Sequence, residues 1–424
     1  MRRVIVFFGL LILIWMKAYG THQRAGEITY RHISGMTYEV TLVTYTYSPS
    51  PADRPQLDIN WGDGNVETVN RDSVSDLTSV LRYNRYRAVH TYSAASSYII
   101  SMEDPNRNGG VLNIPGSVNI PFYIESTLVI NPFFPGNNSP VLLNPPVDNA
   151  CVYKKFITNP GAYDVDGDSL SYSLVTCLGA GGQQIPGYTD PQSTNGIFEI
   201  DPFTGDIVWD APPLAGEYNI AILVKEYRNG LFIGSILRDM QIHVVPCDNM
   251  PPILSVGDAY CVVAGELLLF NVSANDPNLE DSLYLTATGG PFLFPENPAF
   301  FAGGEGIGSV AGLFTWTPDC SQISLQPYFV YFKVRDNSNE VSLIDIKTVS
   351  IEVLAPPVEQ FSASRHPQGI QLQWDVLECG QVIGYSLYRK AGDDGLEPDA
   401  CQTGIPPEWG YELIATIQGA TENT

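Results

Sequence analysis

Residues 205–210 read Gly-Asp-Ile-Val-Trp-Asp, and residues 312–317 read Gly-Leu-Phe-Thr-Trp-Thr. Each stretch follows a cysteine at nearly the same spacing, because Cys151 precedes Trp209 much as Cys261 precedes Trp316. An aspartate-rich turn that ends in Asp-Ser-Leu lies within each interval, and an alternating strand pattern follows each tryptophan. A repeat of about 110 residues is too long for a solenoid unit and fits one β-sandwich domain. The sequence therefore predicts a tandem array of sandwiches.

The composition of the whole chain favours strands over helices. The 424 residues include 23 tyrosines, 32 prolines and 38 glycines, whereas charged residues make up 16%. Aromatic residues favour strands, and glycine and proline punctuate turns. Beyond the N-terminus, no long segment has the 3.6-residue apolar period of a helix. We expect an all-β fold of several domains.

The first 20 residues have the features of a secretory signal peptide. Arg2 and Arg3 supply a positive end, and Val4 to Trp15 supply an apolar run that is shorter than the roughly 20 residues of a bilayer span. We expect the mature chain to be secreted or held at the cell surface, with no membrane span after cleavage. An uncleaved anchor is the alternative.

The net charge of −24 excludes one class of partner. Phosphate binding needs a basic surface, so we expect no nucleic acid as a partner. A strongly acidic exported protein is suited to cation binding, and solubility alone is the alternative explanation.

Seven cysteines in an exported chain indicate disulfides rather than a metal cluster. The sequence has no Cys-x-x-Cys pair, which argues against a zinc ribbon. The sequence does not fix the connectivity, and Cys247 is left over from the local pairings. Those pairings are Cys151 with Cys177, Cys261 with Cys320, and Cys379 with Cys401.

Residues 21–135 form a first predicted unit, in which alternating strands precede a glycine-rich turn. Trp61-Gly62-Asp63-Gly64 places a tryptophan on a buried strand before a tight turn, where glycine permits positive φ. His90 and Tyr92 then begin another strand. This combination resembles the polycystic-kidney-disease-type (PKD) domain, an immunoglobulin-like sandwich. The resemblance implies that His90 is a structural residue of the strand.

Residues 147–246 and 255–353 form the two repeats. In the first repeat, the run from Asp164 to Tyr172 and the Asp-Pro-x-Thr-Gly turn at 201–205 resemble the cadherin-like or immunoglobulin-like domains of bacterial surface proteins. The second repeat matches this pattern more loosely, because it lacks both the aspartate string and the turn.

Residues 357–424 form a fourth predicted unit. Its strand patterns around Trp374 and Tyr385 resemble the second and third strands of a fibronectin type III domain, whose last two strands are missing. We expect the chain to be a fragment of a longer protein.

The best candidate for a binding site is the run Asp164, Asp166 and Asp168. Alternate carboxylates in a loop can direct several hard oxygens at one Ca²⁺. The spacing is not that of an EF-hand, so we expect a cadherin-like calcium site completed by backbone carbonyls and an acid from another loop. The alternative is a solvated turn whose aspartates bond backbone groups. Asp276 and Asp281 are a weaker candidate in the second repeat.

Catalytic motifs are missing from the sequence. It contains neither His-Glu-x-x-His nor Gly-x-Ser-x-Gly, and its five histidines are scattered over different units. We expect a non-catalytic extracellular protein for adhesion or cell-surface interaction, with a protein or polysaccharide as ligand. One alternative is a set of accessory modules for a secreted hydrolase, and another is a structural spacer without a ligand.

The order of the units resembles that of large surface proteins of gliding bacteria of the Bacteroidetes type. These proteins combine a leader with PKD-like, cadherin-like and fibronectin-like domains. The resemblance implies the type IX secretion machinery as a partner during export.

Overall fold

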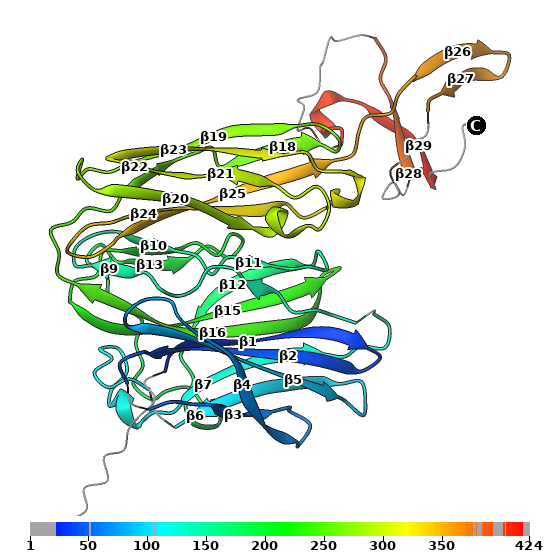
Figure 1. Cartoon of the computed structure of the whole chain (residues 1–424). Coiled ribbons are helices and arrows are strands. Elements are labelled where there is room, and N and C mark those ends of the chain that lie inside the picture. Colours follow the sequence, from blue (N-terminus) through cyan, green and yellow to red (C-terminus); the bar gives the residue numbers. More distant parts are fainter. Residues whose placement is uncertain are drawn as a thin grey trace, which may run out of the picture.

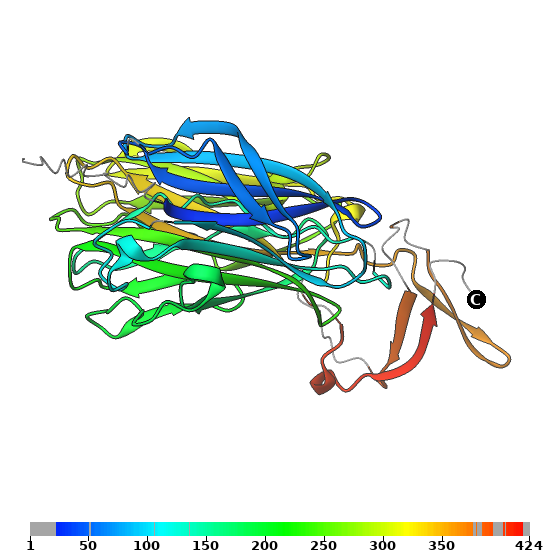
Figure 2. The same cartoon turned by 90° about the horizontal axis from the view of Figure 1, so that it is seen from below.

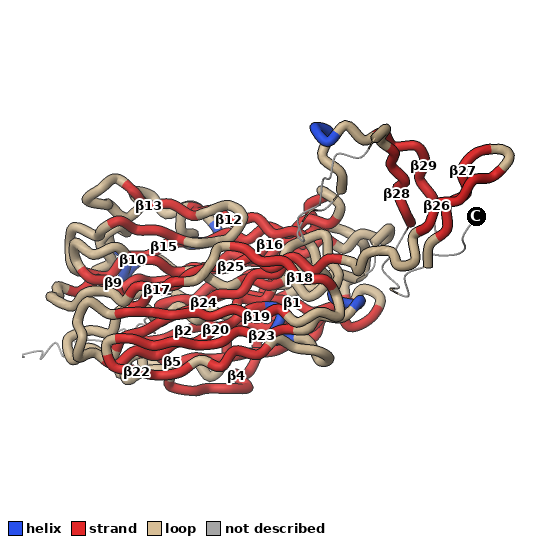
Figure 3. The backbone as a smooth tube through the Cα atoms, turned by 90° about the horizontal axis from the view of Figure 1, so that it is seen from above, coloured by secondary structure: helices blue, strands red, loops and turns tan. Residues whose placement is uncertain are grey.

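Almost every regular element of this computed structural model is a β-strand (Figures 1 and 3). The structure describes residues 23–50, 52–105, 107–134, 136–375, 379, 384–392, 402 and 404–418, so the predicted signal peptide lies outside the described residues. In this part of the chain, no helix is long and apolar enough to cross a membrane. The helical elements described are 3₁₀ turns: η1 (Ser117–Asn119), η2 (Ala180–Gly182), η3 (Gly290–Leu293), η4 (Cys320–Gln322) and η5 (Pro407–Trp409). The prediction of an all-β fold is confirmed.

The first unit is a ring of antiparallel strands. Its order is β1-β2-β5-β4-β3-β6-β7, and strand β16 of the first repeat pairs with both β7 and β1 to close the ring. Trp61 is 1% exposed within the apolar core of this ring, as the sequence predicted. The strands are β1 (Gln23–Ser34), β2 (Thr37–Tyr47), β3 (Gln56–Asn60), β4 (Val66–Asp76), β5 (Leu81–Thr91), β6 (Ser97–Asp104) and β7 (Phe122–Val129).

The hairpin of β15 (Gly216–Arg228) and β16 (Leu231–Val245) connects the first unit to the first repeat. Strand β16 carries a nearly unbroken run of buried residues, because the first unit covers one part of it and the first repeat covers the other. The two units therefore share a sheet; their separation into domains at residues 135 and 147 remains a prediction. The core around Trp209 also contains residues of the first unit: Ala25, Val43, Tyr45 and Leu81.

The first repeat forms a second sandwich. Strands β9, β12, β15 and β16 make one layer, and the order β10-β14-β13 makes the other. Trp209 on β14 is fully buried and donates its indole N–H to the carbonyl oxygen of Gln192 at 2.9 Å. The remaining strands are β8 (Val141–Leu142), β9 (Asn149–Cys151), β10 (Phe156–Thr158), β11 (Ala162–Tyr163), β12 (Ser169–Val175), β13 (Ile197–Ile200) and β14 (Ile207–Asp210).

The second repeat forms a third sandwich from two separate sheets. Their orders are β17-β19-β23-β21 and β18-β25-β24-β20-β22, with Trp316 buried between them. The strands are β17 (Ile253–Ser255), β18 (Ala259–Val263), β19 (Leu268–Asn275), β20 (Ser282–Gly289), β21 (Phe300–Ala302), β22 (Gly304–Ile307), β23 (Ser309–Trp316), β24 (Tyr328–Asp336) and β25 (Ile344–Leu354).

The second and third sandwiches lie side by side rather than end to end (Figure 1). Tyr331 of β24 is 1% exposed and donates its hydroxyl hydrogen to the carbonyl oxygen of Ala162, at 3.0 Å. Lys333 forms an ion pair with Asp148 at 2.5 Å. Since the chain reverses between the two repeats, the tandem array is a packed body instead of a row.

Two short hairpins follow the third sandwich and project from its side (Figure 2). They pair β26 (Ser362–His366) with β27 (Gly369–Gln373), and β28 (Gly384–Arg389) with β29 (Glu412–Gln418). Trp374 is buried and meets Tyr385 in an edge-to-face contact, with ring centroids 5.7 Å apart. The fibronectin type III resemblance of this segment remains a prediction.

The local cysteine pairings proposed from the sequence are wrong. Cys151 is bonded to Cys247, and Cys320 is bonded to Cys379 in the last unit. The first bridge forms because β9 runs parallel to β16, so that Cys151 lies beside the chain that leaves β16, with a Cα–Cα distance of 5.9 Å. Cys177 is a free, buried cysteine.

Candidate metal centre

Three acidic side chains meet at one end of the second sandwich. Asp164 and Asp168 come from the turn between β11 and β12, and Glu226 comes from the end of β15. We call them the first carboxylate cluster; one oxygen of each lies within 4.8 Å of the others. The sequence had not indicated Glu226, because this residue reaches the cluster from another element and no local spacing marks it.

Asp164 organises the turn of the first carboxylate cluster. Its Oδ1 accepts hydrogen bonds from the backbone N–H groups of Asp166 and Asp168, at 2.9 and 3.1 Å. Its Oδ2 and the Oε1 of Glu226 are buried and have no hydrogen-bond partner among the described residues. The Asp164 side chain therefore bonds the backbone of its own turn, as the alternative prediction stated. This side chain is buried, whereas residues 165–167 of the turn are exposed.

Asp166 does not join this cluster. Its carboxylate accepts hydrogen bonds from the backbone and side-chain nitrogens of Asn138, at 2.9 and 2.8 Å. Arg228 forms ion pairs with Asp166 at 3.2 Å and with Asp168 at 2.5 Å. The structure thus brings together two of the three predicted ligands and places an arginine beside them.

The electrostatics of the first carboxylate cluster favour protonation. Burial, followed by the nearby charges of Asp168 and Asp166, raises the pKa of Asp164 to about 7. Burial, followed by the charge of Asp164, raises the pKa of Glu226 to about 10. Buried carboxylates behave in this way when they lack a close cation to offset desolvation.

The third sandwich carries a second carboxylate cluster in the same place. Asp276 and Asp281 lie in the turn between β19 and β20, and Asp336 ends β24. One oxygen of each again lies within 4.8 Å of the others. Burial is the main cause that raises the pKa of Asp276 to about 6, and burial also raises the pKa of Asp336. The sequence had indicated Asp276 and Asp281, but not Asp336.

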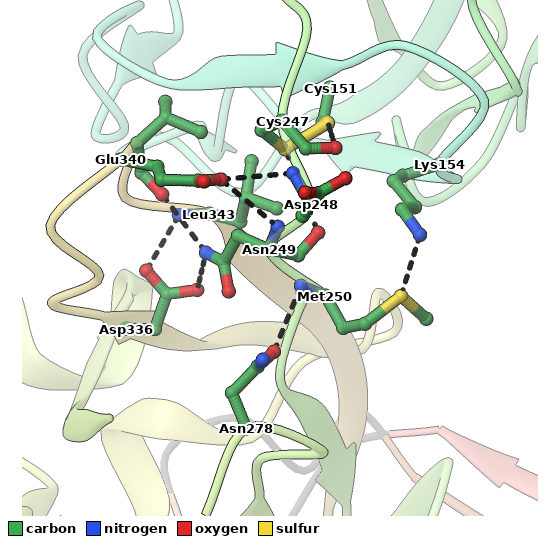
Figure 4. Close-up of a disulfide and its surroundings, with 11 residues drawn as sticks. Cys151, Lys154, Cys247, Asp248, Asn249, Met250, Asn278, Asp336, Glu340 and Leu343 are labelled. Carbon is green, nitrogen blue, oxygen red and sulfur yellow. Dashed lines mark hydrogen bonds between the residues drawn. A yellow bond between two sulfur atoms is a disulfide. The ribbon is translucent and has the colours of Figure 1, made fainter. Parts of the chain in front are cut away.

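An asparagine from the preceding linker completes each cluster. Asn137 donates its amide hydrogen to Glu226 at 2.9 Å, and Asn249 donates to Asp336 at 2.8 Å. Figure 4 shows Asn249 in the linker that follows the Cys151–Cys247 disulfide. The side chain of Glu340 accepts hydrogen bonds from the backbone N–H groups of this linker, which holds the linker against the third sandwich.

His90 has the structural role that the sequence implied, but the prediction that it begins a strand is wrong, because His90 lies near the end of β5. Its ring stacks on Trp61 with centroids 4.5 Å apart, and its Nε2 lies 2.8 Å from a carboxylate oxygen of Asp63 in the glycine-rich turn. Asp63 and His90 therefore fasten the turn to β5.

No family model and no curated protein matches this chain. Among solved structures, an ectodomain fragment of ICAM-5 is 13% identical, with 91% of this chain and 87% of that chain covered and a TM-score of 0.19. The cadherin-like domains 1 to 4 of zebrafish RET are 10% identical to this chain. The match covers 82% of this chain and 76% of that chain, with a TM-score of 0.18. Drosophila N-cadherin EC1-3 is 11% identical, with 73% of this chain and 92% of that chain covered and a TM-score of 0.18. At such scores these likenesses carry no conclusion about function, and the sandwich architecture rests on the strand pairing itself.

Proposed function

We propose that this chain is a non-catalytic extracellular protein that serves adhesion or cell-surface interaction through contact with a protein or polysaccharide. The observation that supports this proposal is that three sandwiches form one body. The first two share a sheet and a hydrophobic core, and the third packs side by side with the second. Such a body keeps its loops and outer sheet faces in fixed relative positions. A fixed surface loses little conformational entropy on binding, which favours a recognition role.

Two disulfides support an extracellular location. Cys151–Cys247 and Cys320–Cys379 would be reduced in the cytosol, and such bridges persist in oxidising compartments. We further propose the PKD-like, cadherin-like and fibronectin-like assignments, and export by type IX secretion in a bacterium of the Bacteroidetes type. These finer assignments rest on the sequence motifs alone.

Calcium remains our proposed cofactor. In the first carboxylate cluster, the residues that could hold it are Asp164, Asp168 and Glu226, while Asp166 is committed to Asn138 and Arg228. An ion would have to compete there with the guanidinium group of Arg228. Calcium bound at a sandwich end would supply the positive charge that the buried carboxylates lack.

The binding role can be tested with the purified chain on beads. We expect saturable attachment of the beads to a panel of immobilised polysaccharides or to whole cells, with no chemical change in the ligand. Release of reducing sugars or peptides from the ligand by the purified chain would refute a non-catalytic role.

A further inference from the structure

A cavity of about 280 Å³ opens at one end of the first unit. Four parts of the chain form its wall: the turn between β1 and β2 at Gly35, the loop between β5 and β6 at Ala95, the segment after β7 at Pro132, and the β15–β16 hairpin at Ile233. Gly35, Ala95 and Pro132 are exposed and lie at the mouth, whereas Tyr38 and Ile233 are buried in the wall. The two carboxylate clusters do not explain why the protein keeps such a space.

An irregularity in the hairpin places one apolar side chain in the wall of the cavity. Gly234 lies opposite Glu226 and Phe232 lies opposite Tyr227, so Ile233 between them has no partner on β15. A bulge of this kind re-aims the side chain of the extra residue. Ile233 is 3% exposed and lines the cavity.

The polar side chains of the wall already form hydrogen bonds within the protein. The amide nitrogen of Asn137 donates to Glu226 at 2.9 Å, and its amide oxygen accepts from Arg228 at 2.8 Å. The backbone of Asn137 bonds the hydroxyl group of Tyr38. The amide oxygen of Asn131 accepts a hydrogen bond from the backbone N–H two residues later, at 3.0 Å. A sugar in this cavity would lose its hydrogen bonds to water and find few replacements, which is costly.

The charge of the wall argues against an ionic occupant. Among the described residues that line the cavity, Arg228 alone carries a charge, and its ion pairs with Asp166 and Asp168 offset that charge. Apolar side chains such as Met36 and Ile130 make up much of the remaining wall. A neutral, apolar group therefore complements the cavity. Because the whole chain has a net charge of −24, basic residues around that group would favour association.

The volume of the cavity fits one aromatic ring. A cavity of about 150 Å³ accepts benzene, and sites for drug-sized ligands begin at about 300 Å³. At about 280 Å³, the space suits a single aromatic side chain better than an oligosaccharide or a large cofactor.

Exposed apolar side chains border the mouth of the cavity. Phe133 stands between the lining residues Pro132 and Phe134 and is 90% exposed. Ile33, two residues before Gly35, is 45% exposed. Large apolar groups that gather at the surface mark sites of contact with other proteins.

We propose that this cavity is the contact site for a protein partner, that it takes one aromatic side chain of that partner, and that Phe133 packs against the partner beside this anchor. An aromatic anchor in a desolvated pocket is the usual energetic centre of a protein interface. The contact site rests on the interaction role proposed above, and it makes a protein, rather than a polysaccharide, the ligand.

The first test uses indole, the aromatic group of tryptophan, as the probe. We expect calorimetric titration of the purified chain to show a single indole site. Ala95→Trp should abolish this binding, because a bulky side chain at the mouth closes the cavity. Ala94→Trp is the matched control, since Ala94 is exposed in the same loop and does not line the cavity, and it should bind indole as the unaltered chain does. Both variants should keep the melting temperature of the unaltered chain.

The second test uses beads that carry the purified chain, with whole cells as their target. Protease treatment of the cells should remove attachment, whereas periodate oxidation of their glycans should leave it intact. Beads with Ala95→Trp should not attach, and beads with Ala94→Trp should.

The proposal is overturned if indole does not bind, if Ala95→Trp binds indole or cells as well as Ala94→Trp does, or if periodate removes attachment and protease does not. Beads that attach to no cell would refute the interaction role itself, and the indole titration would still decide whether the cavity accepts an aromatic group.

Discussion

One link between the first two units is a pair of buried charges. Arg238 on β16 donates two hydrogen bonds to Glu27 on β1, at 2.9 and 3.1 Å, and a third to the carbonyl oxygen of Asn144 at 2.6 Å. Arg238 is 1% exposed and Glu27 is 5% exposed. Replacing the arginine by methionine keeps most of its length and leaves the Glu27 carboxylate buried without its cation.

The structure gives the size of the expected effect. Breaking one side of a buried ion pair costs about 3–5 kcal/mol, because the remaining charge is desolvated and uncompensated. For a cooperative unit of about 200 residues, each kcal/mol lowers the melting temperature by about 2–4 °C, so Arg238→Met should lower it by roughly 6–20 °C. The exposed pair Arg31–Glu39 on neighbouring strands β1 and β2 is the matched control, and Arg31→Met should cost less than about 1 kcal/mol.

Differential scanning calorimetry and urea unfolding of the purified chain provide the measurement. The double variant Glu27→Leu with Arg238→Met should recover most of the lost stability, because no buried charge remains. The reasoning is refuted if Arg238→Met is no worse than Arg31→Met, or if the double variant is as unstable as Arg238→Met alone.

Three further predictions follow from the described contacts. In chelator, the free energy of unfolding should fall as the pH rises from about 4 to about 7. The raised pKa values make the folded chain hold protons on Asp164 and Glu226 more tightly than the unfolded chain does. Glu226→Gln should flatten this pH dependence in melting curves, and an unchanged slope would contradict the raised pKa of Glu226. Cys151→Ser should cost about 4–5 kcal/mol in urea unfolding, since the bridge to Cys247 closes a loop of 96 residues; a loss below about 1 kcal/mol would argue against it. Trp316→Ala should lower the free energy of unfolding by about 3–5 kcal/mol, because the indole fills the core of the third sandwich, and Trp316→Phe should lower it less. Equal losses of stability in the two variants would show that the cavity is not the cause.

The sequence predicted those parts of the fold that local patterns encode. Trp61, Trp209 and Trp316 are buried as expected, and the strands after the last two are present as β15 and β24. These features depend on side chains that alternate between core and solvent within one strand, and this alternation is visible in one sequence.

The shared sheet could not be predicted in this way. In β16, the adjacent residues Leu237, Arg238, Asp239 and Met240 are all buried, because different units cover its two faces. Arg238 and Asp239 find their ion-pair partners far away in the sequence, at Glu27 and Arg107. A charged pair in the middle of a strand ordinarily indicates exposure, and only the tertiary partner reverses that expectation.

The candidate site was predicted in part for a similar reason. Asp164 and Asp168 are close in sequence, so a single turn brings them together. Glu226, Asp336 and Asn249 arrive from other elements, and no local spacing marks them. The cysteines show the same limit, because the parallel pairing of β9 with β16 selects Cys247 as the partner of Cys151 over the nearer Cys177.

The reversal of the chain between the second and third sandwiches limits how far the described sandwiches extend (Figure 1). Sandwiches strung in a line make a long, slender stalk, whereas these stack broadside into a short block, from which the terminal hairpins protrude. The distance that the three packed units cover is therefore set by the width of this block and not by the sum of their lengths (Figure 1).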